Sequence, residues 1–383
     1  MTSASSATAL VPQARPLVKD LLQPSARYYT VDMLITLVVA YGFAGVYFLA
    51  PAFSPPQIIA LVISGFALHR LSNFMHEIVH LESKKALKSF RVAWNVLVGI
   101  PTLMPSYFFG NHIAHHNARQ FGTGDDCEYV ALARGPLSGI AKFMAQIFLQ
   151  PVFVIVRFTV LTPISFLHPK LRQWTLENFS GFVFVWPCPR EIPEDAPRAA
   201  WAAMDIACWL RASAIFVLVA VGLNPWYRIP QLYVLATFAL SLHYFRSLTA
   251  HRYMADGNRQ SFAAQLQDSI DIVGNRYFTE LLYPIGLRYH ALHHMFPNMP
   301  YHNLGIAHRR LMAHLPADSP YRDLVYPSVW SVLRELFQHS RENSAARRRG
   351  GLAVASGARL DAAGSRRRPH TSTVASSSEV AVE

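Results

Sequence analysis

Three clusters of histidines are the residues of this chain most suited to chemistry. The first is His76-Glu77-Ile78-Val79-His80. The other two, at residues 112–116 and 290–294, share one pattern: a histidine, two other residues, and two adjacent histidines. On a helix, residues i, i+3 and i+4 are neighbours on one side. Each cluster therefore predicts several imidazoles directed at one place, as in a metal site.

The number of histidines indicates which metal. Eight are too many for one zinc ion, which takes three or four protein ligands, but they suit two metal ions. Imidazole binds iron as well as zinc, copper and nickel. A site made only of histidine brings no negative charge, which keeps iron electron-poor and oxidising. Because iron also reacts with dioxygen and zinc has no redox chemistry, we predict two iron ions.

The composition shows where these clusters must lie. Of the 383 residues 52% are hydrophobic and only 15% are charged, against roughly a quarter charged in soluble domains. Apolar runs close to the ~20 residues of a membrane-spanning helix occur at 31–50, 57–74, 205–223 and 229–246. We therefore expect an all-α integral membrane protein with four transmembrane helices, with the histidines just outside them.

The loops between these runs predict the topology. Basic residues follow the second run (Lys84, Lys85, Lys88) and the fourth (Arg252), so the positive-inside rule places both termini and residues 75–204 on the cytoplasmic side. The first two clusters can share a site only if 92–109 does not cross the bilayer, so this run should be re-entrant or interfacial. The run at 138–164, which contains Lys142 and Arg157, should likewise lie along the surface.

The rest of the chain is less informative. Residues 1–25 and 341–383 are rich in Ala, Ser, Arg and Gly, and we expect both to be disordered, which leaves a folded domain at 26–340. The formal net charge of +12 is assigned to topology and lipid contacts, and no nucleic-acid partner is expected. The sparse, odd set of Cys127, Cys188 and Cys208 predicts no disulfide framework.

The order of the clusters between paired apolar runs resembles the membrane fatty acid desaturase superfamily, over about residues 30–315. Residues 121–129 (FGTGDDCEY) resemble the G-T-x-x-D-P-E-Y stretch of that family, and residues 293–304 (HHMFPNMPYHNL) resemble its H-H-x-F-P-x-x-P-Y-H-x-L stretch. Two positions depart from the pattern. Cys127 replaces the usual proline, and Ser247 stands where some relatives have an asparagine that holds an iron-bound water.

The resemblance implies a cytoplasmic helical cap that holds a di-iron site, with an acyl chain in a buried tunnel. It includes a ninth histidine, after the fourth run, among the ligands. The implied iron ligands are His76, His80, His112, His115, His116, His251, His290, His293 and His294. The candidates for contacts behind them are Asp125, Asp126, Glu128, Asp268 and Ser247. Glu77 is adjacent to a ligand but should point about 100° away from it on an ideal helix.

The resemblance favours an oxygen-dependent oxidoreductase that introduces a double bond into a lipid acyl chain. The alternative is a hydroxylase of an acyl, alkane, sphingolipid or carotenoid chain, because both reactions begin by abstracting hydrogen. No heme-binding H-P-G-G stretch is present, so the two electrons should come from a separate ferredoxin or cytochrome b5-type donor. A more remote alternative is an intramembrane zinc protease built on His76, Glu77 and His80, which would leave the other two clusters unexplained.

Overall fold

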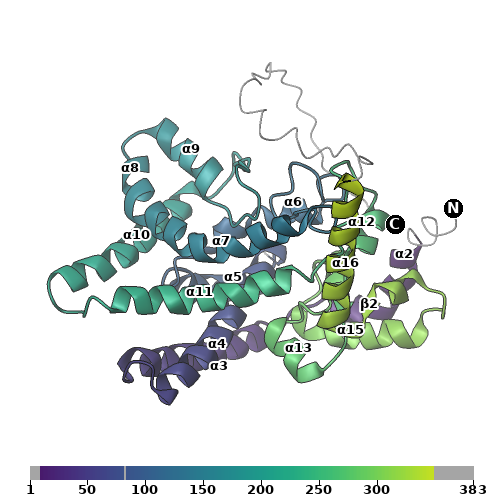
Figure 1. The fold of residues 1–383 in the computed structure, drawn as a ribbon, viewed down its shortest axis with the longest axis horizontal. Coiled ribbons are helices and arrows are strands. Elements are labelled where there is room, and N and C mark those ends of the chain that lie inside the picture. Colours follow the sequence, from purple (N-terminus) through teal and green to yellow (C-terminus); the bar gives the residue numbers. More distant parts are fainter. Residues whose placement is uncertain (1–8, 82, 349–383) are drawn as a thin grey trace. The chain divides into compact units, whose positions relative to one another are not determined.

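A computed structural model describes residues 9–81 and 83–348 of the chain. Five long helices dominate it: α3 (Ala26–Leu49), α4 (Pro55–His80), α7 (Leu137–Val156), α10 (Arg198–Ala220) and α11 (Arg228–Ser247). Figure 1 shows these helices gathered at one end and most of the short helices at the other. The all-α prediction is confirmed, because sheet in the described residues is limited to the parallel pair β1 (Asp271–Ile272) and β2 (Val325–Tyr326).

Of the other elements, α16 (Val329–Arg348) is also 20 residues long, and the rest are short segments that precede or connect the long helices. In chain order they are α2 (Leu10–Val18), η1 (Lys19–Leu21), η2 (Lys85–Leu87), α5 (Lys88–Trp94), the π-helix η3 (Asn95–Gly99), η4 (Ser106–Phe109), α6 (His112–His116), the π-helix η5 (Arg157–Leu161), α8 (Thr162–Ser165), α9 (Pro169–Phe179), α12 (Phe262–Asp268), α13 (Arg276–Leu282), α14 (His290–Met295), α15 (Tyr301–His314) and η6 (Pro320–Leu324).

Helix α4 carries the first histidine cluster directly out of the long-helix region. It starts with a Ser54 cap and Pro55 in its first turn, both favourable at a helix N-terminus, and continues for 26 residues to His80. Gly65 permits close packing against α11, because a Cβ at this position would lie 2.1 Å from the Phe238 ring. The tight contact holds α4, which ends at the first histidine cluster, against α11, which precedes His251.

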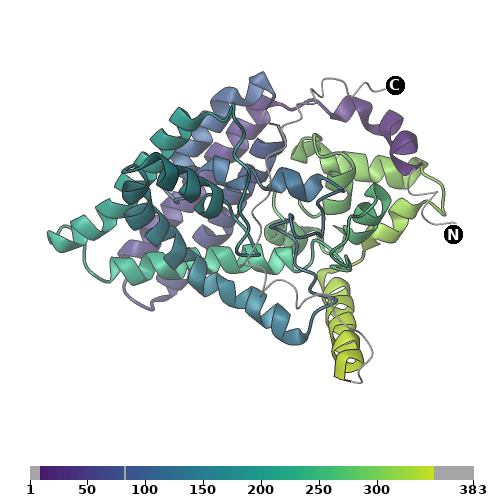
Figure 2. The same cartoon turned by 90° about the horizontal axis from the view of Figure 1, so that it is seen from above.

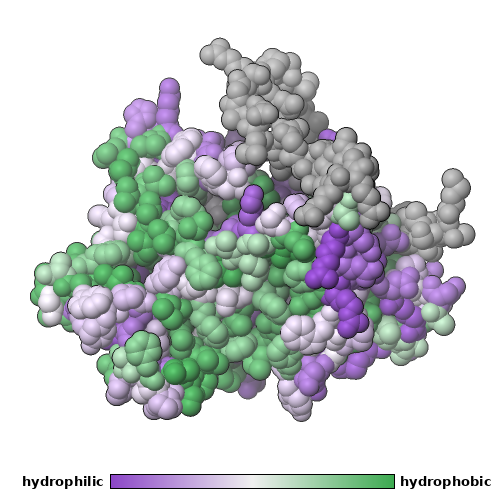
Figure 3. All heavy atoms as spheres, viewed as in Figure 1, coloured by the Kyte–Doolittle hydropathy of each residue, from purple (hydrophilic) through white to green (hydrophobic). Residues whose placement is uncertain are grey.

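Four helical segments are long and apolar enough to cross a membrane: Ala26–Leu49, Pro55–His80, Leu137–Ser165 and Arg198–Ala220. Figure 3 shows apolar residues over α7, α10 and α11, and polar residues towards α15. Large apolar side chains exposed on these segments include Val38, Phe153 and Val217. Water would disfavour such a surface, whereas lipid would not.

This set differs from the predicted spans in one member. The predicted run 229–246 forms α11, which does not qualify, because it is polar at both ends, with Pro230 and Gln231 at its start and His243 and Arg246 near its end. The run 138–164, which we predicted to lie along the surface, does qualify. One reason for that prediction was wrong: Arg157 is not at the surface but 4% exposed and paired with Asp205 of α10.

Residues 92–109 reverse direction, as the meeting of the first two clusters requires. The helical stretch α5–η3 ends at Gly99, and the chain then turns back so that the Ser106 N–H donates to Asn95 Oδ1 at 2.9 Å. No single helix runs through 92–109 in the described chain. We call the three histidine clusters box one (76–80), box two (112–116) and box three (290–294). Box one, at the end of α4, and box two, in α6, therefore approach each other from the same side.

The expected disorder of both chain ends is wrong where they are described. Helix α2 lies within 1–25 and packs against α15, as Figure 2 shows at the right of the view. Leu10, Ala14 and Val18 are buried at i, i+4 and i+8, a helical spacing that the prolines and polar residues around it obscured. At the other end, α16 runs eight residues past the predicted boundary at 340 to Arg348; residues 1–8 and 349–383 lie outside the described chain.

The prediction of no disulfide is also corrected. Cys127 and Cys188 are joined, 61 residues apart in sequence, with Cα atoms 5.8 Å apart. The segment around 184 folds back on the loop after box two, where the Phe184 N–H donates to Cys127 O at 2.9 Å. The pair is brought together by tertiary structure, so its spacing in sequence carried no signal. It also accounts for the cysteine that replaces the usual proline.

Candidate metal centre

All nine predicted ligands come together in two adjoining groups. One group holds His76, His80, His112, His116 and His293, and the other holds His115, His251, His290 and His294. Within each group, one nitrogen from every histidine lies within 4.8 Å of those of the others. The groups are in contact, since the rings of His116 and His294 stack with centroids 4.1 Å apart.

The two histidine triplets divide between the groups in a regular way. In each triplet, the first and last histidines, at i and i+4, belong to one group, and the middle histidine, at i+3, belongs to the other. His112 and His116 thus face the first group while His115 faces the second, and box three has the reverse arrangement. Each short helix therefore supplies both groups, which accounts for the repeated spacing and refines the expectation that all three rings serve one point.

The nitrogen spacing fits metal ions. Nε2 of His251 lies 2.9 Å from Nε2 of His290 and 3.0 Å from Nε2 of His115. In the first group the Nε2 atoms of His112 and His116 lie 3.0 Å apart. A metal about 2.1 Å from each imidazole nitrogen places ligands at right angles about 3 Å apart. Both nitrogens of His76 are buried without a hydrogen-bond partner among the described residues, and a bound cation would engage the lone pair of one of them.

Acidic side chains orient several of these imidazoles from behind. Glu128 Oε2 lies 2.8 Å from His112 Nδ1, and Asp126 Oδ2 lies 2.9 Å from His115 Nδ1. Asp268 Oδ2 is 3.6 Å from His251 Nδ1. A carboxylate that accepts the Nδ1 proton leaves Nε2 free to bind a metal. The loop geometry depends on Gly122, whose φ is +67° and whose N–H donates to Asp126; a Cβ there would lie 2.4 Å from Ala255.

The electrostatics also suit a cation site. Burial lowers the pKa of His290 and of His294 well below the ordinary histidine value, and neighbouring histidines lower it further. Both rings are therefore neutral at physiological pH and keep a lone pair for a metal. Burial raises the pKa of Glu128 to about 8, so its charged form depends on positive charge nearby.

Two other predicted residues, Asp125 and Ser247, do not contact the ligands as expected, and Glu77, for which no such contact was predicted, makes other hydrogen bonds. Asp125 is exposed, and its backbone N–H is bonded to Thr123. Ser247 lies one turn before His251, but its hydroxyl donates to the His243 carbonyl at 2.9 Å. Glu77 accepts hydrogen bonds from the Tyr29 hydroxyl and from the Tyr301 N–H, and its Oε1 is 3.6 Å from His76 Nδ1. Its two hydrogen bonds tie α4 to α3 and α15.

Sequence reasoning missed two residues that take part in the site. Gln265 of α12 donates to the His115 carbonyl at 3.0 Å and lies 3.4 Å from His294 Nδ1. Arg246 near the end of α11 is buried beside the centre. Neither belongs to a recognisable motif. For Arg246 a signal did exist, since an arginine inside a predicted span is itself unusual.

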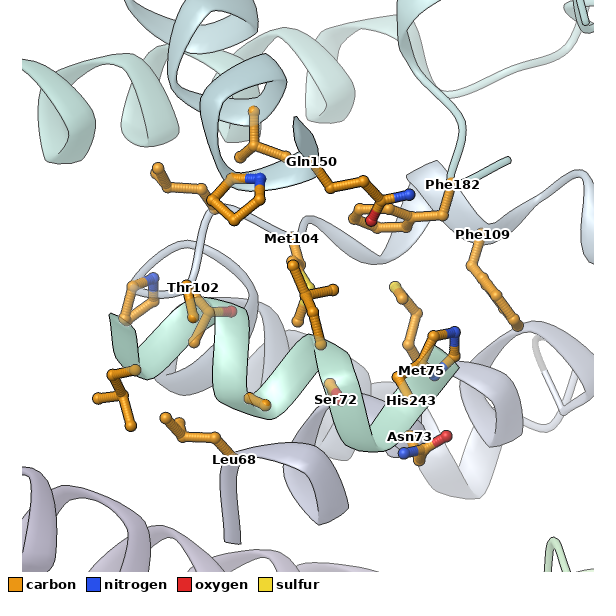
Figure 4. Close-up of a pocket in the computed structure, with 18 of the residues that line it drawn as sticks. Leu68, Ser72, Asn73, Met75, Thr102, Met104, Phe109, Gln150, Phe182 and His243 are labelled. Carbon is orange, nitrogen blue, oxygen red and sulfur yellow. The ribbon is translucent and has the colours of Figure 1, made fainter. Parts of the chain in front are cut away.

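An elongated cavity of about 780 Å³ leads to the two groups. His76, His112, His115, His251 and His290 line one end of it. It continues between α3, α4, α7, α10 and α11, past apolar side chains, towards Phe48 and Ile229. Figure 4 shows part of the wall, with Met104 and Leu68 away from the histidine end and Phe109 towards it. From Ile229 to Arg246, α11 is about 25 Å long, which is a length suited to a lipid chain.

Comparisons with known proteins agree with this geometry. A sequence model of the family described as fatty acid desaturase matches residues 52–325. The chain is also 35% identical, over 351 residues, to a protein of Caulobacter vibrioides named ceramide hydroxylase. That alignment covers 90% of this chain and 98% of the relative.

Proposed function

Because the chain belongs to the fatty acid desaturase family, we propose that it is a membrane di-iron enzyme that hydroxylates a ceramide-type lipid. The observation that carries the proposal is the pair of histidine groups at the end of a lipid-sized cavity. The family consists of oxygen-dependent oxidoreductases that include both desaturases and hydroxylases. Desaturation, which the resemblance in box three favoured, is the less supported of the two.

The relative supports hydroxylation over desaturation. Its similarity extends over nearly the full length of both chains, and its name specifies a ceramide hydroxylase. The box-three stretch that favoured a desaturase holds the fold together in this structure. Asn303 of that stretch donates to the Leu21 carbonyl at 2.7 Å, and His302 stacks on Tyr28. It therefore carries little information about the reaction.

In this proposal each histidine group holds one iron, because the donor set and its 3 Å spacing fit. Bound iron would supply redox chemistry with dioxygen. The chain's own part is to keep the imidazoles neutral, to orient them through Asp126, Glu128 and Asp268, and to place one C–H bond of the lipid beside them. A displacement of about 1 Å at this point can change the outcome of such a reaction.

The overall reaction balances as follows. A C–H bond of the lipid becomes C–O–H, and one oxygen atom of O₂ enters the product. The other oxygen atom leaves as water, which takes up two protons and two electrons. We propose that the electrons come from a separate ferredoxin or cytochrome b5-type protein.

The remote protease alternative is not supported by the geometry. It needs the carboxylate of Glu77 free to activate a metal-bound water. Here Glu77 is engaged by Tyr29 and by the Tyr301 N–H. The two histidines of that motif also belong to a five-histidine group rather than to a three-ligand site.

The cytoplasmic placement of the centre and of both termini stays a prediction. The basic residues after α4 favour it, whereas the Cys127–Cys188 bond is typical of an oxidising compartment. Labelling of a cysteine introduced at the exposed position 125 decides the side. Reaction with a membrane-impermeant reagent only after permeabilisation supports the cytoplasm, and reaction in intact cells overturns that placement.

The direct test of the function is lipid analysis. The full chain is expressed in a host that is fed ceramide, and the lipids are compared by mass spectrometry with those from the His115→Ala variant. We expect a ceramide that has gained one oxygen atom, with none from the variant. A ceramide or acyl chain that has instead lost two hydrogens would show a desaturase, and no new product would refute the proposal.

A further inference from the structure

One buried cation at the inner end of the cavity has no partner that explains it. Arg246 is 8% exposed. Its Nε is buried without a hydrogen-bond partner, and its one side-chain hydrogen bond is a long 3.5 Å contact to Ser247. No carboxylate lies within ion-pair distance of it among the described residues. Glu128 acts on Arg246 electrostatically but is not in direct contact with it. A buried guanidinium without a direct ion pair is costly, so this position suits an external partner.

The surroundings of Arg246 indicate where that partner lies. Arg246 lines the cavity together with His251 and His290, and it precedes His251 by only five residues. His243, one turn earlier on α11, also lines the cavity, and its ring has no hydrogen bond in the described structure. Figure 4 shows His243 beside Met75, close to Asn73 of α4. Polar side chains are thus concentrated at the histidine end of an otherwise apolar cavity.

A second buried polar group without a hydrogen-bond partner indicates which kind of lipid head group suits the site. Glu128 Oε1 is buried without a hydrogen-bond partner, and Glu128 lines the same cavity. An unsatisfied donor and an unsatisfied acceptor therefore face one space without forming an ion pair. An amide with nearby hydroxyls offers both a carbonyl oxygen and N–H or O–H donors. A fatty acid carboxylate offers only acceptors, so it could bind Arg246 but would leave Glu128 Oε1 without a donor.

We propose that Arg246 binds the polar head of the ceramide at the inner end of the cavity, an inference that rests on the proposed function. The carbon presented to the histidines then lies close to that head. The guanidinium donates to the amide carbonyl, with His243 beside it. The acyl or sphingoid chain extends away between α4 and α11 towards Phe48 and Ile229. A lipid placed in this way lies parallel to the long helices, as it does in a bilayer.

A competing anchor exists in the same cavity. Arg211 of α10 also lines it but is only partly buried, and it lies among Tyr41 and Phe216, away from the histidines. If the head were held there, the carbon beside the histidines would be further along the chain. The two arrangements predict different products, which makes the proposal testable by the position of the hydroxyl.

The first experiment measures binding without turnover. Full-length protein in detergent is titrated with a fluorescent ceramide and, in parallel, with a fluorescent fatty acid. We expect Arg246→Gln to weaken ceramide binding at least tenfold, a loss of about 1.4 kcal/mol, with iron content unchanged. Arg246→Lys should recover part of the affinity. Arg198→Gln is the matched control, because this exposed arginine at the start of α10 is bonded to Gln173 and does not line the cavity.

The second experiment locates the hydroxyl. Ceramides with short, medium and long acyl chains are supplied, and fragmentation in the mass spectrometer gives the modified carbon. With the head held by Arg246, the position counted from the amide stays the same for every chain length and lies within a few carbons of it. A position that moves with chain length, or lies in mid-chain, would overturn the proposal, as would a loss of binding in Arg211→Gln and not in Arg246→Gln.

The two proposals fail in different ways. If the wild type hydroxylates ceramide and Arg246→Gln does so with equal affinity and at the same carbon, the head-binding role is wrong and the function stands. If the wild type binds ceramide through Arg246 but yields no hydroxylated product, the reaction is wrong and the head-binding role stands.

Discussion

Two buried polar regions of this molecule differ in where their partners come from. At the junction of α7, α9 and α10, Asp205 accepts from Tyr107 at 2.5 Å, Arg157 at 3.0 Å and Arg172 at 2.5 Å. All three nitrogens of the Arg157 guanidinium donate hydrogen bonds within the chain. The charges here are neutralised by the chain itself, and Asp205 neither belongs to the two histidine groups nor lines the cavity that leads to them.

The inner end of the cavity shows the opposite condition. Imidazole nitrogens lie about as close together as the ligands of one metal ion. Among the described residues, neither nitrogen of His76 has a hydrogen-bond partner, and Arg246 forms no ion pair with a carboxylate. Buried polar groups are normally satisfied. The difference teaches that the first region maintains the fold, whereas the second is built to be completed by metal ions and a lipid head.

The largest effect should come from removing His293, which lies close to two other histidines of the first group. His293 Nε2 lies 3.2 Å from His80 Nε2 and 3.1 Å from His116 Nε2. We expect His293→Ala to abolish hydroxylation and to lose iron from the first group, measured by metal analysis and lipid mass spectrometry. His314→Ala, an exposed histidine on α15, is the control. Full activity in His293→Ala would remove this residue from the centre.

The next largest effect, a loss of stability, should follow from a change at Asp205, in the region whose charges are neutralised within the chain. Asp205→Ala leaves two arginines at this junction without their carboxylate, and breaking a buried ion pair in this way costs roughly 3–5 kcal/mol. We expect a large drop in the unfolding temperature in detergent. Asp195→Ala, at an exposed carboxylate, should not change it.

Arg246→Gln provides the contrast between the two regions. Because this substitution removes a buried charge that has no partner in the chain, we expect an unfolding temperature equal to or above that of the wild type without lipid. A loss of stability as large as that of Asp205→Ala would show that Arg246 is held by the fold and would contradict the comparison.

A smaller effect on metal binding is expected from changing a carboxylate that contacts a histidine ligand. Asp126→Asn retains the shape but loses the charge that orients His115, and changes of this kind typically cost about 10–100-fold in metal affinity. Iron retention during titration with a chelator measures it. The adjacent Asp125→Asn is a matched control, since Asp125 is exposed. Equal iron loss in both variants would show that the Asp126 contact does not support the site.

The smallest effect should follow from Glu77→Gln. Glutamine keeps an oxygen that can accept from the Tyr301 N–H, so we expect at most the loss of about one hydrogen bond, near 1 kcal/mol in stability, with iron and hydroxylation retained. A zinc protease would lose all activity in this variant. Complete loss of lipid hydroxylation in Glu77→Gln would assign this carboxylate to the chemistry.

Features that depend on residues close together in sequence could be predicted, whereas features that depend on contacts between distant segments could not. Eight of the nine histidines were found because their spacing repeats along single helices, and His251 because the family resemblance implied it. Asp126 and Glu128 were found because they follow box two closely. The Cys127–Cys188 bond and the burial of Arg157 could not be found, since both depend on segments distant in sequence. Arg246 was missed for a related reason, because only the cavity shows that no partner is present. The membrane span at 229–246 was predicted from the apolar residues in the middle of this run. The polar residues of α11 lower its mean hydropathy, so the helix is not among the candidate spans.

The most direct test of the central claim is the metal content of the purified full-length chain. Protein prepared in detergent with iron in the medium is analysed for iron, zinc, copper and nickel against the measured protein concentration. Two histidine groups predict two irons per chain, and less in His293→Ala. One zinc per chain with no iron, or no bound metal at all, would contradict the account.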